Sequence, residues 1–203
     1  MVDSSIVERA KEHIIDALKQ NKADVLGQIL KQYPIDEVIM PPGKTMLMLA
    51  CEFKETKLPM LKLLKQFSPS VNKQDTCGRT ALHFACRAGK TDFVKELCGF
   101  KGIDVNRRTL GGETPLMAAA QSGEIFCVGE CLNNNFNPFL ENSLHETARD
   151  FARNFPNVYG HKLRDVIDNA IKQWREQIPD AQLNQMITKP QTFYPEFTVV
   201  PKP

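Results

Sequence analysis

One eight-residue segment recurs four times along the chain, and its spacing constrains the fold more than any other feature. Each copy has a threonine at its third position, followed mainly by small and apolar residues; the copies begin at Gly43, Gly78, Gly112 and His145. The intervals between the threonines (Thr45, Thr80, Thr114 and Thr147) are 35, 34 and 33 residues. A period of this length predicts a stacked array of similar supersecondary units.

Each copy is typical of a turn that leads into a helix. A glycine two residues before the threonine suits a tight turn with positive φ, and the threonine hydroxyl can cap the helix that follows. Pro115 stands at the first turn of its helix, where proline is tolerated. A second stretch then has the i, i+3, i+4 spacing of a half-buried helix, as in Phe93, Val94 and Leu97.

The recurring segment resembles the signature of the ankyrin-repeat family, threonine-proline-leucine-histidine-x-alanine. Thr80, Leu82, His83 and Ala85 match it in one copy, and Thr114-Pro115-Leu116 matches it in the next. The resemblance implies an all-α ankyrin-repeat helical solenoid of about five units over residues 1–177. The expected units are at about 8–40, 41–75, 76–109, 110–142 and 143–177.

The outer units depart from the family pattern. Met48 replaces the histidine, Arg149 and Asp150 replace the leucine and the histidine, and residues 8–40 lack the signature altogether. Ala17 nevertheless stands 33 residues before Ala50, in phase with the array. Terminal repeats are expected to be atypical because one of their faces meets water.

Residues 178–203 form a different kind of segment, with five prolines and no helical period after Met186. Phe193, Tyr194 and Phe197 lie between the prolines, whereas a disordered tail is usually poor in aromatic residues. We expect an extended C-terminal arm that docks either on a partner or on the chain's own last repeat.

Composition excludes several classes of function. A formal net charge of +2 does not provide the basic stripe of a nucleic-acid binder, and no apolar run approaches the ~20 residues that span a bilayer. The N-terminus does not resemble a secretory signal, and the six cysteines contain no C-x-x-C motif. Reduced thiols and an intracellular, cytoplasmic location are therefore expected; an organelle-bound or cytoskeletal assembly is also compatible.

A few residues could carry chemistry. Cys86, Cys127 and Cys131 could ligate zinc, and His83 with Cys86 could form a nucleophilic pair. The ankyrin pattern buries these cysteines, however, where a thiol behaves as a small apolar residue, and the resemblance implies that His83 bonds between neighbouring repeats. We therefore expect no catalytic, cofactor or metal site; an enzyme that uses Cys86, His83 or Asp150 is the rival interpretation.

The candidate partner-binding residues come from three places. By resemblance, Arg107, Arg108 and Leu110 lie at the tip of a projecting finger, where arginine can bind carboxylates of a partner or simply be solvated. Leu49, Phe84 and Phe151 occupy positions that face the concave groove in the family, where exposed apolar side chains tend to mark protein contacts. The arm adds Phe193, Tyr194 and Phe197, which could instead cover the groove.

The functional expectation is a protein–protein interaction scaffold, a structural or accessory subunit of a larger multi-protein complex. The alternative is a reversible regulator or inhibitor of a single signalling or transcription partner. Partners are one or more proteins, with no nucleic acid and no direct membrane insertion.

Overall fold

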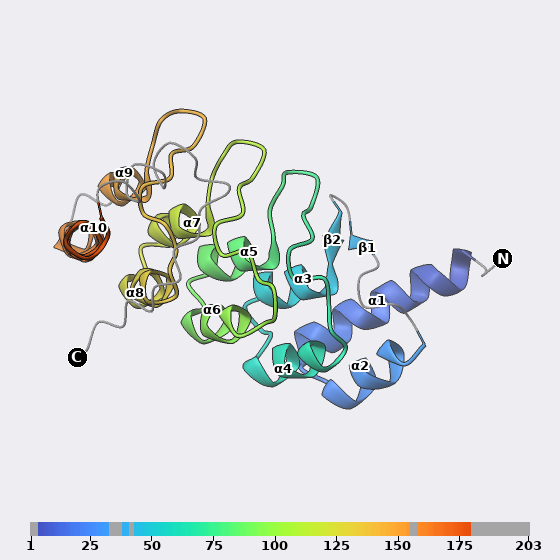
Figure 1. Cartoon of the computed structure of the whole chain (residues 1–203). Helices are drawn as coiled ribbons and strands as arrows, with labels where there is room; N and C mark the ends of the chain where they lie inside the picture. Colours follow the sequence, from blue (N-terminus) through green and yellow to red (C-terminus); the bar gives the residue numbers. More distant parts are fainter. Residues whose placement is uncertain (1–3, 33–37, 41–42, 155–157, 180–203) are drawn as a thin grey trace.

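The computed structural model describes residues 4–32, 38–40, 43–154 and 158–179, and it is an array of paired helices (Figure 1). The pairs are α1 (Ser4–Gln20) with α2 (Ala23–Leu30), α3 (Met46–Glu52) with α4 (Leu58–Gln66), α5 (Ala81–Arg87) with α6 (Thr91–Cys98), α7 (Pro115–Ser122) with α8 (Ile125–Asn133), and α9 (Ala148–Phe151) with α10 (Val158–Gln177). A 3-10 turn, η1 (Ala152–Asn154), extends α9, and β1 (Val38–Met40) pairs antiparallel with β2 (Lys44–Thr45). The predicted all-α repeat solenoid is confirmed.

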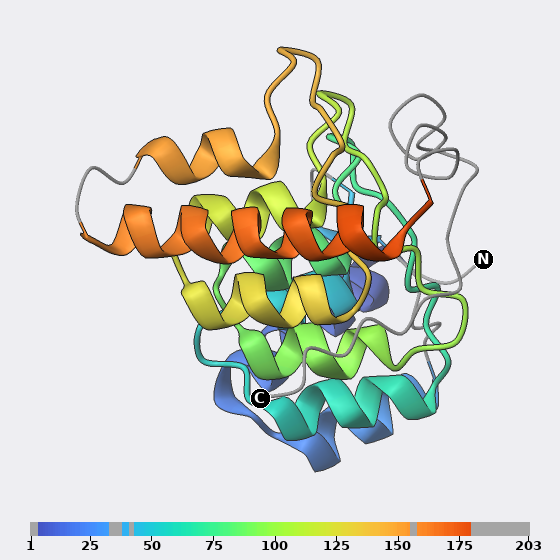
Figure 2. The ribbon, with the colours of Figure 1, turned by 60° about the vertical axis from the view of Figure 1, so that its left-hand side comes forward.

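The helices stack in two rows. The odd-numbered helices α1, α3, α5, α7 and α9 contact one another in sequence, and the even-numbered helices α2, α4, α6, α8 and α10 do the same (Figures 1 and 2). Buried alanines on the odd row, Ala50, Ala85 and Ala119, allow neighbouring helices to approach closely. Each unit therefore buries its apolar face mainly against the adjacent units, as in other repeat proteins.

The threonine immediately before each of α3, α5, α7 and α9 is the capping residue that the sequence predicted. The hydroxyl of Thr45 accepts from Met48 N at 3.4 Å, and that of Thr114 accepts from Met117 N at 3.3 Å. The third helical residue then reaches back to the threonine N–H, through Met48 Sδ, His83 Nδ1, Met117 Sδ and Asp150 Oδ2. The departures at Met48 and Asp150 thus keep the local hydrogen bond of the family histidine.

Between units the chain forms projecting fingers. Gly78, Gly112 and His145 occupy equivalent positions and have φ of 80°, 78° and 60°. A Cβ atom at Gly78 would lie 2.7 Å from the backbone nitrogen of Leu110 in the next finger. Leu110 N donates to Cys77 O at 3.0 Å and Ser143 N donates to Gly111 O at 2.9 Å, so neighbouring fingers are joined through their backbones.

Asparagine side chains also join successive loops, which follow the C-terminal ends of the even-numbered helices. Asn72 Oδ1 accepts from Asp104 N at 2.8 Å while its amide donates to Gly102 O at 2.7 Å. Asn106 Oδ1 accepts from Asn137 N at 2.7 Å in the same way one repeat later. Asn135, expected in a left-handed conformation, has φ of 62°. Each loop is therefore held by a side chain from the preceding repeat.

Two further expectations concern the ends of the array. Ala17 is buried, and the break predicted at Asn21-Lys22 separates α1 from α2. α10 ends at Gln177, and most of the expected arm, including Phe193, Tyr194 and Phe197, lies outside the described residues. None of the helices in the described ranges is both long enough and apolar enough to cross a bilayer.

Candidate partner-binding surface

The face formed by the row of odd-numbered helices, called the odd-row face, does not present the apolar stripe that the sequence predicted. Leu49 is 0% exposed and Phe84 is 5% exposed. Lys44 Nζ lies 5.2 Å from the Phe84 ring centroid and Arg79 Cζ lies 4.8 Å from it, so two cationic side chains from adjacent repeats cover the ring. Phe151 is partly buried. The expectation of exposure is therefore wrong for Leu49 and Phe84.

What this face presents instead is polar and internally paired. Lys44 Nζ lies 2.7 Å from a carboxylate oxygen of Glu52, and Arg79 lies 2.7 Å from one of Asp75. Arg87 donates to Gln121 Oε1 at 3.1 Å. The hollow lined by Arg79, Arg87, Gln121 and Ala118 has a volume of about 20 Å³, which is room for roughly one water molecule. This hollow is far too small to hold a small-molecule substrate.

Exposed apolar side chains gather instead at the tips of the fingers. Leu110 is 80% exposed and Leu144 is 76% exposed, and Cys77 is also exposed. The three fingers project side by side on one side of the helix array (Figure 1), and the backbone bonds between them hold the tips in a row. We call Cys77, Leu110 and Leu144 the fingertip strip.

The two finger arginines differ in what they contact. Arg108 Nε donates to Gly112 O at 3.2 Å, and its Nη2 donates to Glu141 O in the next finger, so Arg108 braces two fingers. Arg107 has a side chain 47% exposed; it donates to Gln74 Oε1 at 3.1 Å and lies 4.0 Å from a carboxylate oxygen of Asp104. Arg107 is therefore the more exposed of the two.

Sequence reasoning missed two exposed side chains, Leu144 and Phe126, the latter 82% exposed on α8. Both had a signal in the sequence. Leu144 stands three residues before the capping Thr147, within the turn that precedes it. Phe126 falls on the face of α8 opposite to the buried Cys127, Val128 and Cys131, so helical periodicity alone places it outward.

The residues proposed for catalysis are engaged in structural contacts. Thr80 N donates to His83 Nδ1 at 3.1 Å, so Nε2 carries the proton and donates to Glu113 O in the next repeat at 3.2 Å. This is the bond between repeats that the family resemblance implied for His83. Burial lowers the pKa of His83 to about 4 and raises the pKa of Cys86 well above its usual value. A neutral imidazole beside a protonated thiol is not an activated nucleophilic pair.

Comparison with known proteins agrees with this architecture. A family model for ankyrin repeats (3 copies) matches residues 14–109 and 47–142. The chain is similar to a putative ankyrin repeat protein of Acanthamoeba polyphaga mimivirus, at 28% identity over 134 residues (61% of this chain, 18% of that protein). It is also similar to human ankyrin repeat domain-containing protein 63, at 37% over 83 residues (40% and 22%). An E3 ubiquitin-protein ligase of Arabidopsis thaliana matches at 35% over 92 residues (45% and 18%).

These matches are limited in extent. The chain spans about a fifth of the length of each of these three relatives. The family match lies within the helical repeats of this chain.

Proposed function

This chain belongs to the ankyrin-repeat family of protein-binding modules, and on that premise we propose that it is a non-enzymatic scaffold, a structural or accessory subunit of a larger multi-protein complex. The fingertip strip is the surface that would bind the partner. The observation that carries the proposal is the exposure of Leu110 and Leu144, at 80% and 76%, on adjacent fingers.

Exposed leucines in this place favour burial by a partner. Fully burying a leucine side chain contributes about 1.5–3 kcal/mol, so two neighbouring tips offer a useful part of a binding free energy. Arg107 stands three residues before Leu110 and its side chain is 47% exposed, so it can bind a partner carboxylate by exchanging its contacts with Gln74 and Asp104. An apolar centre with an arginine at its edge is a common arrangement at protein interfaces.

The fingers are also well supported for this role. The carboxylate of Asp75 accepts from Arg79 N at 2.8 Å, and Asn142 Oδ1 accepts from Glu146 N at 2.9 Å, so side chains at finger bases fix their turns. The bonds between fingers add to this support. A surface that is ordered before binding loses little conformational entropy when the partner arrives.

The apolar character of the strip favours a stable subunit over the alternative, a reversible regulator. Contacts dominated by buried leucines depend weakly on salt, whereas a contact steered by charge weakens as ionic strength rises. The odd-row charges could serve a regulator, but Lys44, Arg79 and Arg87 already have partners within the chain.

The test is to purify the tagged full chain from its native cells and to determine the mass and stoichiometry of what accompanies it, at low and high salt. We expect a stoichiometric complex that resists high salt and is lost in the double variant Leu110→Asp/Leu144→Asp. Phe126→Asp is the matched control, because Phe126 is equally exposed but lies on α8, away from the fingers.

Other results would redirect the proposal. A free monomer in native cells would refute the subunit function, and a complex dissociated by salt would favour the regulator. Loss of the complex in Phe126→Asp but not in the leucine double variant would move the interface to the even row. Deleting residues 180–203 tests separately whether the arm, with Phe193, Tyr194 and Phe197, contributes to the same complex.

A further inference from the structure

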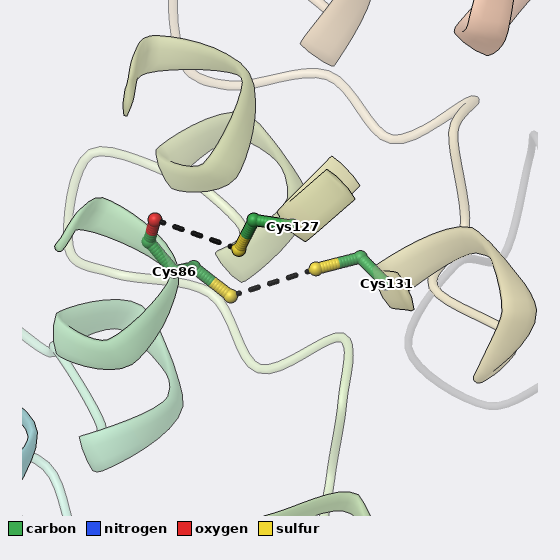
Figure 3. A group of neighbouring side chains, drawn as sticks. All are labelled: Cys86, Cys127 and Cys131. Carbon is green, nitrogen blue, oxygen red and sulfur yellow. Dashed lines mark hydrogen bonds between the residues drawn. The ribbon is translucent and has the colours of Figure 1, made fainter. Parts of the chain in front are cut away.

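Three cysteine sulfur atoms converge in the interior where α5 of one repeat faces α8 of the next (Figure 3). Cys86 lies near the end of α5, and Cys127 and Cys131 lie one turn apart on α8. The Sγ atoms of Cys86 and Cys131 are 3.6 Å apart, and all three sulfurs lie within 4.8 Å of one another. Each residue is 0% exposed, which confirms the burial that the sequence predicted but does not explain the convergence.

Apolar packing alone accounts poorly for cysteine at the two positions on α8. Cys127 and Cys131 stand 13 and 17 residues after the capping Thr114. The residues at the same distances after Thr80 are Phe93 and Leu97, and both are buried. The preceding repeat thus fills the two places with larger side chains, as expected of a densely packed core.

The sulfur triangle has the dimensions of a metal site. At a metal–sulfur distance of about 2.3 Å, as in zinc thiolates, three sulfurs around a central ion are about 4 Å apart. The observed separation of 3.6 Å for one pair, with the third sulfur within 4.8 Å of both, is close to that arrangement. Modest side-chain rotation would bring the three sulfurs onto one ion.

We propose that Cys86, Cys127 and Cys131 form a buried three-sulfur site for copper(I), a soft ion that accepts few ligands. Thiolate ligands select soft ions such as copper(I). Structural zinc requires four protein ligands, whereas the metal-ligating group found here among the described residues has three. Binding forms copper–sulfur bonds without any change of oxidation state, and a thiol proton released on binding passes to water.

The surroundings of the cluster favour a monovalent ion. Cys86, Cys127 and Cys131 are all 0% exposed, and a divalent ion would bring more charge into this apolar interior than a monovalent one.

The chain supplies a matched control for this site. Cys51 stands six residues after Thr45, as Cys86 does after Thr80, and it is also 0% exposed. Cys51 is not a member of the three-sulfur group. Replacing Cys51 therefore tests the loss of a buried thiol at an equivalent position without touching the proposed ligands.

The experiment is an anaerobic competition between the full chain and the copper(I) chelator bicinchoninate, in a Cys77→Ser/Cys98→Ser background that removes the two less buried thiols. The chain is refolded with the chelator complex so that the ion can enter before the core closes. We expect one copper(I) per chain and an affinity lowered more than about 100-fold in Cys131→Ala, since loss of outer-shell partners alone costs 10–100-fold. Cys51→Ala should keep the affinity of the background chain.

X-ray absorption at the copper edge of the loaded chain, with all three ligands intact, gives a second result that does not depend on a variant folding. Sulfur-only coordination with three ligands supports the site. Nitrogen or oxygen ligands, an absence of binding, or equal affinity in Cys131→Ala and the background chain would overturn it, and the cysteines would then be core residues only.

Discussion

Replacing His83 by methionine should remove a specific part of the acid sensitivity of this protein. His83 is 4% exposed and is locked in its neutral form, because Nδ1 accepts from Thr80 N while Nε2–H donates to Glu113 O. Its pKa is lowered from 6.5 to about 4, chiefly by burial. Methionine is the natural replacement, because Met48 and Met117 occupy the same position in other repeats and make the same bond to their threonines.

The sign and size of the effect follow from this shift. Because the folded protein holds the imidazole neutral, the stabilisation is complete above pH 6.5 and is lost as the pH falls toward 4. At about 1.4 kcal/mol per pKa unit, the full loss is roughly 3 kcal/mol, and about 2 kcal/mol of it occurs between pH 7 and pH 5. At pH 7 the variant should itself be about 1 kcal/mol less stable, because Glu113 O loses a hydrogen bond.

Urea unfolding followed by circular dichroism at pH 7 and pH 5 measures the difference. The free energy of unfolding of the unsubstituted chain should fall by about 2 kcal/mol more than that of His83→Met. His145→Asn is the control, because His145 is an exposed finger residue with positive φ, a conformation that asparagine tolerates. If the unsubstituted chain and His83→Met lost the same free energy of unfolding between pH 7 and pH 5, the neutral, bridging role of His83 would be refuted.

Three further substitutions, two of them paired with a control substitution, test the packing between repeats by the same unfolding measurement. Gly78→Ala should destabilise the protein by more than about 1 kcal/mol, because φ is 80° and the new Cβ would meet Leu110 N at 2.7 Å. The control Gly129→Ala lies on α8 with nothing within 4 Å of its Cβ and should stabilise the protein by about 0.5–1 kcal/mol. Equal effects of the two substitutions would contradict the finger geometry. Lys90→Met should destabilise the protein by about 1–3 kcal/mol, because Lys90 Nζ donates to Ala50 O and Phe53 O at the end of α3. An unchanged stability would show that water takes over the hydrogen bonds to these two carbonyl groups. Asn72→Ala should cost about 1–2 kcal/mol through its two bonds to the next loop, while Asn133→Ala, at an exposed position, should stay within about 0.5 kcal/mol of the parent.

The repeat itself could be predicted from the sequence because its determinants are local. The spacing of Thr45, Thr80 and Thr114 locates the helix starts, and positive φ at Gly78 follows from the residue type. The exposure of Phe84 could not be predicted in this way. Its ring is covered by Lys44 from the preceding unit and by Arg79, and that cover depends on how two units stack.

The cysteine cluster and the fingertip strip also depend on contacts between units that the sequence does not reveal. Cys127 and Cys131 share a helix face by their spacing, but their approach to Cys86, 41 and 45 residues away, depends on the packing of α8 against α6 and α7. Leu144 joins Leu110 on one surface because backbone bonds align their fingers. The type of each side chain is given by the sequence, whereas the contacts between units can be seen only in the folded structure.

The asparagine bonds between loops all run from one repeat to the next in the order of synthesis. Asn72 leaves the ribosome about 30 residues before Gly102 and Asp104, the backbone partners of its amide. Asn106 likewise precedes Asn137 N by 31 residues. Each of these loops is therefore bonded by a side chain that was synthesised before it.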